Sequence, residues 1–479
     1  MDVLSRPFMG IGNINVADAI RNVQQLMEKE KMSPAMRAAL KVILMLVELL
    51  VNKIGLNSKN SSTPPSFDPN RKKTPKQKSE RKPGGQEGHV GKTLGKRANP
   101  DKIKEILVDR TTLPIGNWKV SGYESRQVFD IDISVVVTEY RAEVLMNDYG
   151  ERYTAKFPDG VVSPTQYGDS IRAHAVYLSQ HQMIPFARLQ EYFAHQLNLP
   201  LSAGSLDNFN LKAYEKLDWY PEFVKKQLLG RSVLYTDETG INTNGKRNWV
   251  HVVADPLWTY LFPHAKRGKE AIDAMGTLSS YRGILCHDHW KPYFKFEDII
   301  HALCNAHHLR ELERAYEKEN QQWAPKMSDL LLAMNKAKIG NDGIVPPEQA
   351  MKFRQQYREL IAEAEKECPE PIKSEGKRGR LKRSKARNLL ERLRDFEDAT
   401  LMFMYIKELG FTNNESERAL RMLKVQQKIS GCFKSFQGAK VHCRINSYLA
   451  SATKQGFSAS YALKAMFEGR NIFLENEKG

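Results

Sequence analysis

The sequence predicts a multidomain α+β protein, and three observations support this prediction. A chain of 479 residues is long enough for about three domains, at roughly 150 residues each. Its hydrophobic fraction of 41% is ordinary for a globular protein that buries a core. Apolar residues recur with helical spacing in some stretches and with strand spacing in others. The longest apolar run, residues 42–47, is far short of the ~20 residues that a membrane span needs.

Two further features of the sequence predict the cellular compartment of the protein. The N-terminus lacks a basic start followed by an apolar run, so we expect neither a secretory signal nor a transit peptide. The five cysteines, odd in number and without a Cys-x-x-Cys pair, predict reduced thiols rather than a disulfide framework or a zinc knuckle. Together these features predict a cytoplasmic protein.

The charge balance predicts a polyanionic partner. Lys and Arg number 73 against 56 Asp and Glu, which leaves a net charge of +17. An excess of this sign concentrates nucleic acid near the protein surface. Nucleic acid is therefore the leading partner class, although composition alone does not separate a nucleic-acid enzyme from a basic scaffold or a ribosome-associated protein.

Residues 1–56 are expected to form two helices. Apolar residues recur at steps of four, three and four between Val16 and Met27, and Ser33-Pro34 then supplies an N-cap and a first-turn proline. The second helix carries an apolar seam with alternating spacings of four and three, which is typical of a short coiled coil. The seam indicates self-association, and the alternative is a helix that packs on its own domain. Its residues are Met36, Leu40, Ile43, Val47, Leu50 and Ile54.

Residues 57–100 are expected to form a flexible basic arm. Ser, Pro, Gly, Lys and Arg replace apolar residues there, so the segment cannot bury enough surface to offset the entropy of ordering. Eleven basic residues face three acidic ones between residues 57 and 97. We expect the arm to lie along DNA phosphates, and the alternative is a linker that only aids solubility. Its candidate DNA contacts are Lys72, Lys73, Arg81 and Lys82.

The next two segments are candidates for DNA-binding modules. In residues 101–160, alternating apolar residues from Ile131 to Val137 predict a half-buried strand in a small β-rich domain. Residues 161–230 are expected to be helical. Two periodic pieces there, 186–197 and 206–217, resemble a helix-turn-helix with Ser205 as an N-cap. Lys212 could then face a DNA groove, and the alternative is a helix pair in an ordinary core.

Further along, two short strands each deliver an aspartate. Residues 232–236 form a β-type run that ends at Asp237, and residues 238–240 are expected to be a turn. Residues 249–253 and 258–262 predict a hairpin that pairs with this first strand, and a helix is expected from about Lys269. Residues 283–286 form another short strand, and Asp288 follows it. Two acids at the ends of neighbouring strands can converge on one cation.

A third acid is expected from a helix beside the sheet, because two aspartates are rarely enough to bind two Mg²⁺ ions for phosphoryl transfer. Residues 413–421 open such a helix, with Asn414 as its N-cap and Glu417 as the acid. Three cations follow on the same helical face and would bind phosphates. These are Arg421, Lys424 and Lys428.

A rival interpretation of the same region is a zinc site made of histidines. A His-x-His pair on a strand places both rings on one face. The neighbouring Asp288 and Lys291 fit magnesium and phosphate better. We therefore expect one of the two later histidines to pack or to contact DNA near the site. The four histidines are His287, His289, His307 and His308.

Several unusual strings resemble those of a single family. Residues 57–62 read Asn-Ser-Lys-Asn-Ser-Ser, and residues 81–89 are similar to a Gly-Gly-Gln arm. Residues 235–239 and 286–293 resemble two aspartate-bearing strands, and residues 303–310 resemble a Cys-x-Ala-His-x-x-Arg element whose histidine is His307. Residues 413–421 match a glutamate motif. From about residue 57 to residue 467 the chain thus resembles transposases of the insertion-sequence sixty-six family, which are DDE enzymes with a ribonuclease-H-like core.

The resemblance implies a fold and a set of metal ligands. A ribonuclease-H-like mixed α/β catalytic core would occupy residues 231–315 and, with C-terminal helices, 406–479. Asp237, Asp288 and Glu417 would be its catalytic, metal-binding acids, in agreement with the reasoning from the residues themselves. Two Mg²⁺ ions, or Mn²⁺ as a substitute, would be the cofactors. Many members carry a cysteine-based zinc site near the arm, but here no cysteine precedes Cys286, so no zinc is predicted.

Residues 316–405, between the two parts of the core, are expected to be a helical insertion. The 129-residue step from Asp288 to Glu417 is longer than a compact core requires. A basic cluster within it is interpreted as a mobile loop over DNA, and the alternative is a solvated turn between helices. The cluster contains Lys373, Lys377, Arg378, Arg380, Lys382, Arg383, Lys385 and Arg387.

The resemblance also implies a reaction and partners. The enzyme would bind double-stranded DNA at terminal inverted repeats, free a 3′-hydroxyl and join it to target DNA, as a homodimer or higher oligomer. The segment 101–160 would bind the DNA end, and accessory proteins of the same element would be further partners, in the bacterial cytoplasm near the nucleoid. The alternatives are a metal-dependent nuclease and a non-catalytic DNA-binding protein derived from a transposase. Additional candidate DNA contacts are Lys266, Arg267, His307, Arg310 and Arg418.

Overall fold

The computed structural model describes residues 10–11, 14–30, 32–54, 94–371 and 383–475. Contacts divide the chain into two units, one formed by residues 1–72, 167–186 and 203–479 and the other by residues 73–166 and 187–202. Within the described ranges, none of the helices combines the length and the apolar character that crossing a membrane requires. The arm contacts Lys72, Lys73, Arg81 and Lys82 lie outside the described residues.

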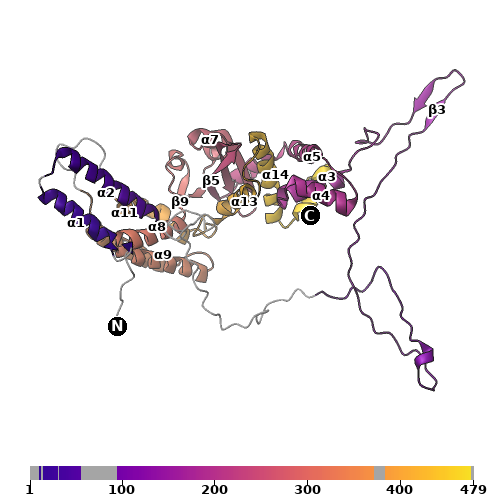
Figure 1. The fold of residues 1–479 in the computed structure, drawn as a ribbon, viewed down its shortest axis with the longest axis horizontal. Helices are drawn as coiled ribbons and strands as arrows, with labels where there is room; N and C mark the ends of the chain where they lie inside the picture. Colours follow the sequence, from indigo (N-terminus) through magenta and orange to yellow (C-terminus); the bar gives the residue numbers. More distant parts are fainter. Residues whose placement is uncertain (1–9, 12–13, 31, 55–93, 372–382, 476–479) are drawn as a thin grey trace. The chain divides into compact units, whose positions relative to one another are not determined.

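The larger unit contains a five-stranded mixed β-sheet (Figure 1). Its strand order is β7-β6-β5-β8-β9. The first three strands are antiparallel, whereas β8 runs parallel to β5 and β9 runs parallel to β8. The predicted hairpin is confirmed, since β6 pairs with both β5 and β7. The strands are β5 (Val233–Thr243), β6 (Lys246–Ala254), β7 (Thr259–His264), β8 (Ile284–His287) and β9 (Ile300–Leu303).

The first strand is longer than the sequence pattern suggested. A turn was predicted at residues 238–240, but β5 continues through them to Thr243, which pairs with Lys246. The turn lies at Asn244 and Gly245, whose φ angles of 48° and 81° suit the tight turn of a β-hairpin. Asp237 is therefore an interior residue of the strand, and the Asn-Gly dipeptide was the better turn signal.

Helices near the C-terminus cover part of one face of this sheet. Helix α13 (Asn414–Ser430) contacts β5 and β6, and α14 (Phe436–Lys454) contacts β7. Leu420 and Leu423 of α13 share a buried cluster with Val250 and Val252 of β6. This packing fixes the position of α13 against the strands that carry the first aspartate. The remaining helices of this region are α3 (Asp169–Val176), a π-helical turn (Tyr177–His181), α6 (Tyr220–Leu229), α7 (Lys269–Met275), α15 (Ala459–Phe467) and α16 (Ile472–Glu475).

The stretch between the second aspartate and α13 is largely helical. A second buried cluster joins Tyr235 of β5 and Cys286 of β8 to apolar residues of these helices, including Trp323 and Met327. The helices therefore pack on the sheet as well as on one another. They are α8 (Asn305–Glu319), α9 (Trp323–Gly340), α10 (Pro347–Glu367), α11 (Lys385–Asp395) and α12 (Glu397–Leu401), and the 3₁₀ turns of the unit are Leu278–Ser280, Tyr293–Lys295 and Met402–Met404.

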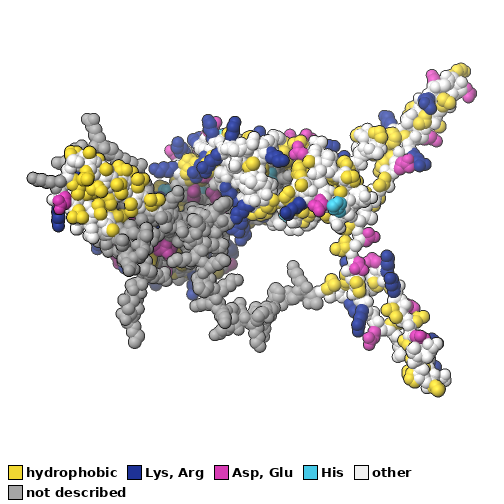
Figure 2. Space-filling view, viewed as in Figure 1, with side chains coloured by type: hydrophobic (Ala, Val, Ile, Leu, Met, Phe, Trp, Pro, Cys, Tyr) yellow, Lys and Arg dark blue, Asp and Glu magenta, His cyan; other side chains and the backbone are white. Residues whose placement is uncertain are grey.

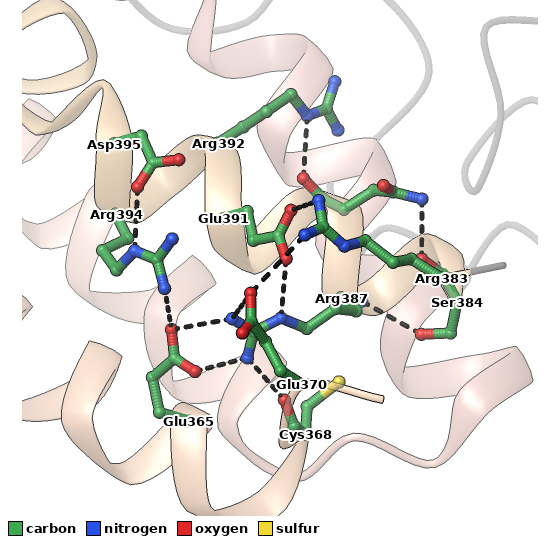
Figure 3. A network of polar contacts seen from close by, with 11 residues as sticks. Glu365, Cys368, Glu370, Arg383, Ser384, Arg387, Glu391, Arg392, Arg394 and Asp395 are labelled. Carbon is green, nitrogen blue, oxygen red and sulfur yellow. Dashed lines mark hydrogen bonds and ion pairs between the residues drawn. The ribbon is translucent and has the colours of Figure 1, made fainter. Parts of the chain in front are cut away.

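Part of the basic cluster predicted to be a loop over DNA is instead buried in this helical region (Figure 3). Arg387 of α11 is 1% exposed and forms ion pairs with Glu365 and Glu391. Its guanidinium also donates to the Cys368 carbonyl at 2.8 Å. Arg383 pairs with Glu391 at 2.6 Å. Arg387 therefore links α11 to the helix that carries Glu365, and Arg383 connects the segment before α11 to α11 itself. Residues 373–382 of the predicted loop lie outside the described residues.

The N-terminal region contains the two predicted helices, α1 (Val16–Lys29) and α2 (Pro34–Ile54), after the short strands β1 (Gly10–Ile11) and β2 (Ile14–Asn15). The Oγ of Ser33 accepts a hydrogen bond from the Met36 amide at 3.2 Å, as an N-cap does. Apolar side chains gather on the surface of these helices, which are indigo in Figure 1 (Figure 2). The exposed seam residues include Met36, Ile43 and Leu50.

The second unit has little regular structure, which corrects one prediction. The half-buried strand expected from Ile131 to Val137 is absent, and Ile131 is 88% exposed. A strand is stable only when its backbone groups are paired and one face is covered, and alternation alone supplies neither. The described elements are a 3₁₀ turn (Arg110–Thr112), the hairpin of β3 (Val144–Met146) and β4 (Arg152–Thr154), and most of α4 (Phe186–Leu197).

The two helices of the predicted helix-turn-helix are present in the structure. They are α4 and α5, and α5 (Ala203–Lys216) belongs to the larger unit. Because α5 begins two residues before Ser205, that serine is inside the helix and is not its N-cap. Lys212 is exposed on α5.

Candidate functional site

The first two predicted acids lie side by side because of the register of two parallel strands. Tyr235 of β5 pairs with Cys286 of β8, and each aspartate follows its paired residue by two positions. Side chains two residues apart on a strand lie on the same face of the sheet. Backbone amides orient both carboxylates: the Glu238 amide donates to Asp237 Oδ1 at 2.8 Å, and the Trp290 amide donates to Asp288 Oδ1 at 3.0 Å.

The third predicted acid lies in the first turn of α13. The N-cap of this helix is Asn413, not Asn414 as predicted. The Nδ2 of Asn413 donates to the carbonyl of Thr236 at 2.7 Å, one residue before Asp237. The Glu417 amide in turn donates to the Asn413 carbonyl at 3.2 Å. One asparagine therefore connects the strand that carries the first acid to the helical turn that carries the third.

The electrostatics indicate that the three acids share one neighbourhood. The pKa of Asp237 is raised well above its ordinary value, first by burial, then by the charges of Glu238 and Asp288, with a further contribution from Glu417. Burial also raises the pKa of Asp288, although the Trp290 amide and the charges of two arginines act in the opposite direction. Buried like charges repel one another, so the arrangement favours a bound cation. Oxygen ligands of this kind suit a hard divalent ion such as Mg²⁺.

The carboxylate next to Asp237 has a different environment. Neighbouring residues on a strand point to opposite faces, so Glu238 has other contacts than Asp237, although its charge still raises the pKa of Asp237. Its Oε1 accepts from Arg267 Nε at 2.9 Å, and its Oε2 accepts from the Tyr293 hydroxyl at 2.6 Å. The guanidinium of Arg267 also lies 4.9 Å from the ring centroid of Trp249 and 4.5 Å from that of Trp290. Arg267, predicted to contact DNA, is thus held by a buried acid and two indole rings.

Sequence reasoning did not identify Arg392 of α11 as a residue of this region. Its charge lowers the pKa of Asp288, and its guanidinium forms an ion pair with Glu311 of α8. Burial lowers the pKa of Arg392 itself. The insertion therefore supplies a partly buried cation close to the second acid. No sequence motif links this arginine to Asp288, because the two come together only when α11 packs on α8.

The other predicted cations have varied environments. Lys424 is engaged, since its Nζ donates to the Gly240 carbonyl at 2.6 Å. Lys266 is exposed and pairs with Glu270 at 2.7 Å. Glu415 pairs with Lys454 of α14 at 3.1 Å. The exposed cations of α13 are Arg418, Arg421 and Lys428, whereas Arg310 of α8 is partly buried.

The four histidines of the rival zinc interpretation do not converge within the described part of the chain. The Nε2 of His287 lies 3.0 Å from His301 Nδ1, and the Nδ1 of His308 lies 3.0 Å from Asn305 Oδ1. Burial lowers the pKa of His307 to about 4, so its ring is neutral at physiological pH. His307 instead approaches Glu417 and Cys304.

Two family models match parts of the sequence. A family model described as "Transposase IS66 family" matches residues 164–441, which is more than half of the chain. A second model, for a family of unknown function designated DUF6444, matches residues 12–94. Among curated proteins, none matches the sequence. The matched range of the first model contains all three acids, and the chain belongs to the IS66 family of transposases, which are DNA-processing enzymes.

Proposed function

We propose that this protein is a DDE transposase that cleaves DNA at the terminal inverted repeats of its element and joins the freed 3′-hydroxyl ends to target DNA. The observation that carries the proposal is the register of β5 and β8, which brings Asp237 and Asp288 to adjacent positions, together with the effect of the Glu417 charge on the pKa of Asp237. Membership of a transposase family supports the reaction class.

The architecture of the sheet supports a ribonuclease-H-like catalytic core. Three antiparallel strands are followed by two parallel ones, with the first aspartate on the central strand β5. The second aspartate follows the adjacent parallel strand, and the glutamate comes from a helix packed across the same sheet. Such a core brings together acids that are distant in the sequence.

The three acids would hold two Mg²⁺ ions, or Mn²⁺ in their place. When bound, the ions would neutralise the carboxylates and activate the attacking and leaving oxygens of an in-line displacement. The protein's own groups orient the site: the Glu238 and Trp290 amides fix the aspartates, and Asn413 fixes the start of the glutamate helix. Arg267 and Arg392 would attract the DNA backbone to the acids.

Other parts of the chain are proposed to bind DNA and to assemble the complex. The basic arm would follow phosphates through Lys72, Lys73, Arg81 and Lys82, and residues 101–160 would bind the element end. The exposed seam of α2 would pair two copies as a coiled coil. Accessory proteins of the same element would be further partners, and the protein would act in the bacterial cytoplasm at the nucleoid.

The proposal is tested with the full chain and oligonucleotides that carry the terminal repeats found beside its gene. We expect Mg²⁺-dependent cleavage at the repeat and joining of pre-cleaved 3′-hydroxyl ends to a second duplex. Asp237→Asn should abolish both while retaining end binding. The matched control is Asp298→Asn, because Asp298 is exposed and belongs to a surface ion pair with Arg282. Its activity should equal that of the wild type.

Each other outcome rejects a defined part of the proposal. Cleavage without joining would identify a metal-dependent nuclease. Binding without cleavage in the wild type would identify a non-catalytic DNA-binding protein. Unchanged cleavage in Asp237→Asn would remove Asp237 from the catalytic site.

A further inference from the structure

A mixed cluster of metal-binding side chains adjoins the three acids. The Sγ of Cys304, a ring nitrogen of His307 and a carboxylate oxygen of Glu417 all lie within 4.8 Å of one another. Two of these atoms come from the N-cap and the first turn of α8, and one comes from the first turn of α13. In the described part of the chain, no other group of three such ligands meets this closely.

The fold holds this cluster together through the backbone. Cys304 is the N-cap of α8 and follows β9 directly, and its amide donates to the His287 carbonyl at 2.9 Å. The His307 amide donates to the Cys304 carbonyl at 3.2 Å, which places the ring in the first helical turn. The Asn413 amide donates to Cys304 Sγ at 3.1 Å, and this contact brings the starts of α8 and α13 together. The three ligands therefore sit on packed helix ends rather than on a loop.

Two chemical observations point to a ligand. The Nδ1 of His307 is buried and has no hydrogen-bond partner among the described residues, although buried polar atoms are nearly always paired. Cys304 is also buried, at 1% exposure, so its sulfur is shielded from bulk solvent.

We propose that Cys304, His307 and Glu417 form a binding site for a borderline divalent ion such as Zn²⁺. Sulfur, imidazole nitrogen and carboxylate oxygen are the three donor types that Zn²⁺ accepts, and a fourth position would remain for water or a DNA oxygen. Mg²⁺ prefers an all-oxygen shell, so it does not suit the thiolate. Binding replaces the thiol proton of Cys304, which is released to the solvent.

The site has a consequence that rests on the proposed function. Glu417 is shared, because it is also the third acid of the proposed Mg²⁺ site. An ion held by Cys304 and His307 would draw this carboxylate away from the catalytic metals. Low concentrations of Zn²⁺ should therefore inhibit Mg²⁺-dependent DNA cleavage.

Binding is tested with Co²⁺, a coloured substitute for Zn²⁺, added to the full-length protein. We expect about one Co²⁺ per chain, with thiolate-to-cobalt charge-transfer absorption that disappears when Zn²⁺ is added. Cys304→Ser should lose the absorption while its hydroxyl still accepts the Asn413 amide. Cys304→Ala provides an independent test of the same ligand. His307→Ala should weaken Co²⁺ binding at least about tenfold.

The control is Cys432→Ser, which changes a cysteine outside the cluster and should keep the absorption. Circular dichroism and thermal melting of each variant show whether it is folded. The proposal is overturned if the folded wild type gives no thiolate absorption with stoichiometric Co²⁺. It is also overturned if a folded Cys304 variant keeps the absorption.

Zn²⁺ inhibition separates this proposal from the proposed function. Cleavage by each variant is compared with its own rate in Mg²⁺ alone, and Cys304→Ser should be inhibited less than the wild type. Co²⁺ absorption without any Mg²⁺-dependent cleavage would support the site and reject the transposase mechanism. Cleavage without Co²⁺ absorption would reject the site and leave the mechanism intact.

Discussion

At the scale of single residues, the raised pKa of Asp237 has a cost for stability. Its pKa in the folded state lies well above the ordinary value of 3.8. The folded protein therefore binds more protons than the unfolded chain between these two values, and its stability falls as pH rises through this window. Ionisation of the buried carboxyl near the charges of Glu238 and Asp288 destabilises the metal-free fold.

Asp237→Asn should therefore raise the melting temperature of the metal-free protein at neutral pH, although it abolishes the proposed activity. The gain should shrink as the pH falls toward 4, because the wild-type carboxyl takes up its proton as the pH falls. Thermal melting in a chelator, from pH 4 to pH 8, measures both effects. Asp298→Asn, at an exposed acid, should show neither. A lower melting temperature for Asp237→Asn at neutral pH would contradict the electrostatic account.

Asn413 connects the strand that carries Asp237 to the start of the helix that carries Glu417, although the two are far apart in the sequence. Asn413→Ala removes its side-chain bond to the Thr236 carbonyl and should destabilise the protein by about 1–2 kcal/mol. It should also reduce DNA cleavage more than DNA binding, because the start of the glutamate helix is no longer fixed to β5. The matched control is Asn414→Ala, at the exposed next position. Chemical denaturation measures the loss of stability, and cleavage assays measure the loss of activity. Equal effects of Asn413→Ala and Asn414→Ala would contradict the role given to the Asn413 side chain.

At the scale of elements, the buried arginine of α11 is expected to hold the helical insertion together. Arg387→Ala removes the buried cation that Glu365 and Glu391 share and should cost about 3 kcal/mol. Arg394→Ala is the control: this arginine also pairs with Glu365, but its side chain is 42% exposed, so the change should cost less than about 1 kcal/mol. Urea denaturation measures the difference. Equal losses of stability in the two variants would show that burial of Arg387 does not strengthen its ion pairs.

Local patterns in the sequence predicted many elements but not their exact limits. The hairpin and the starts of α2 and α7 could be predicted because proline, capping and alternation are local signals. The strand at Ile131–Val137 was wrong because pairing depends on a partner strand that alternation does not report. The Asn413 cap was missed by one position, since Asn413 and Asn414 are equally good caps on local grounds.

At the scale of the whole molecule, the sequence predicted the residues of the candidate site better than it predicted the residues around them. Predicted strand ends and a helix start suggested the three acids; the pairing of β5 with β8 sets Asp237 and Asp288 at adjacent positions, and the charge of Glu417 acts on the pKa of Asp237. The proximity of Arg392 and the burial of Arg387 could not be predicted, because both depend on how distant helices pack. Charge runs alone do not separate a DNA-binding loop from an internal ion-pair network.

The charge distribution leads to a prediction about DNA affinity. Replacing Lys72, Lys73, Arg81 and Lys82 by Gln should weaken DNA binding with little dependence on sequence. The plot of log binding constant against log salt concentration should become shallower by about 0.9 for each phosphate that the arm no longer neutralises. The control exchanges Lys and Arg at the same four positions and should keep the slope. An unchanged slope in the Gln variant would show that the arm does not bind phosphates.

The central claim is that three distant acids bind the same metal ions, and Mn²⁺ binding followed by electron paramagnetic resonance tests it most directly. Asp237→Asn, Asp288→Asn and Glu417→Gln are compared with Glu415→Gln, which alters a neighbouring glutamate that pairs with Lys454. The account predicts that each of the first three changes weakens Mn²⁺ binding by at least about tenfold, whereas Glu415→Gln binds Mn²⁺ like the wild type. Wild-type Mn²⁺ affinity in Glu417→Gln would contradict it.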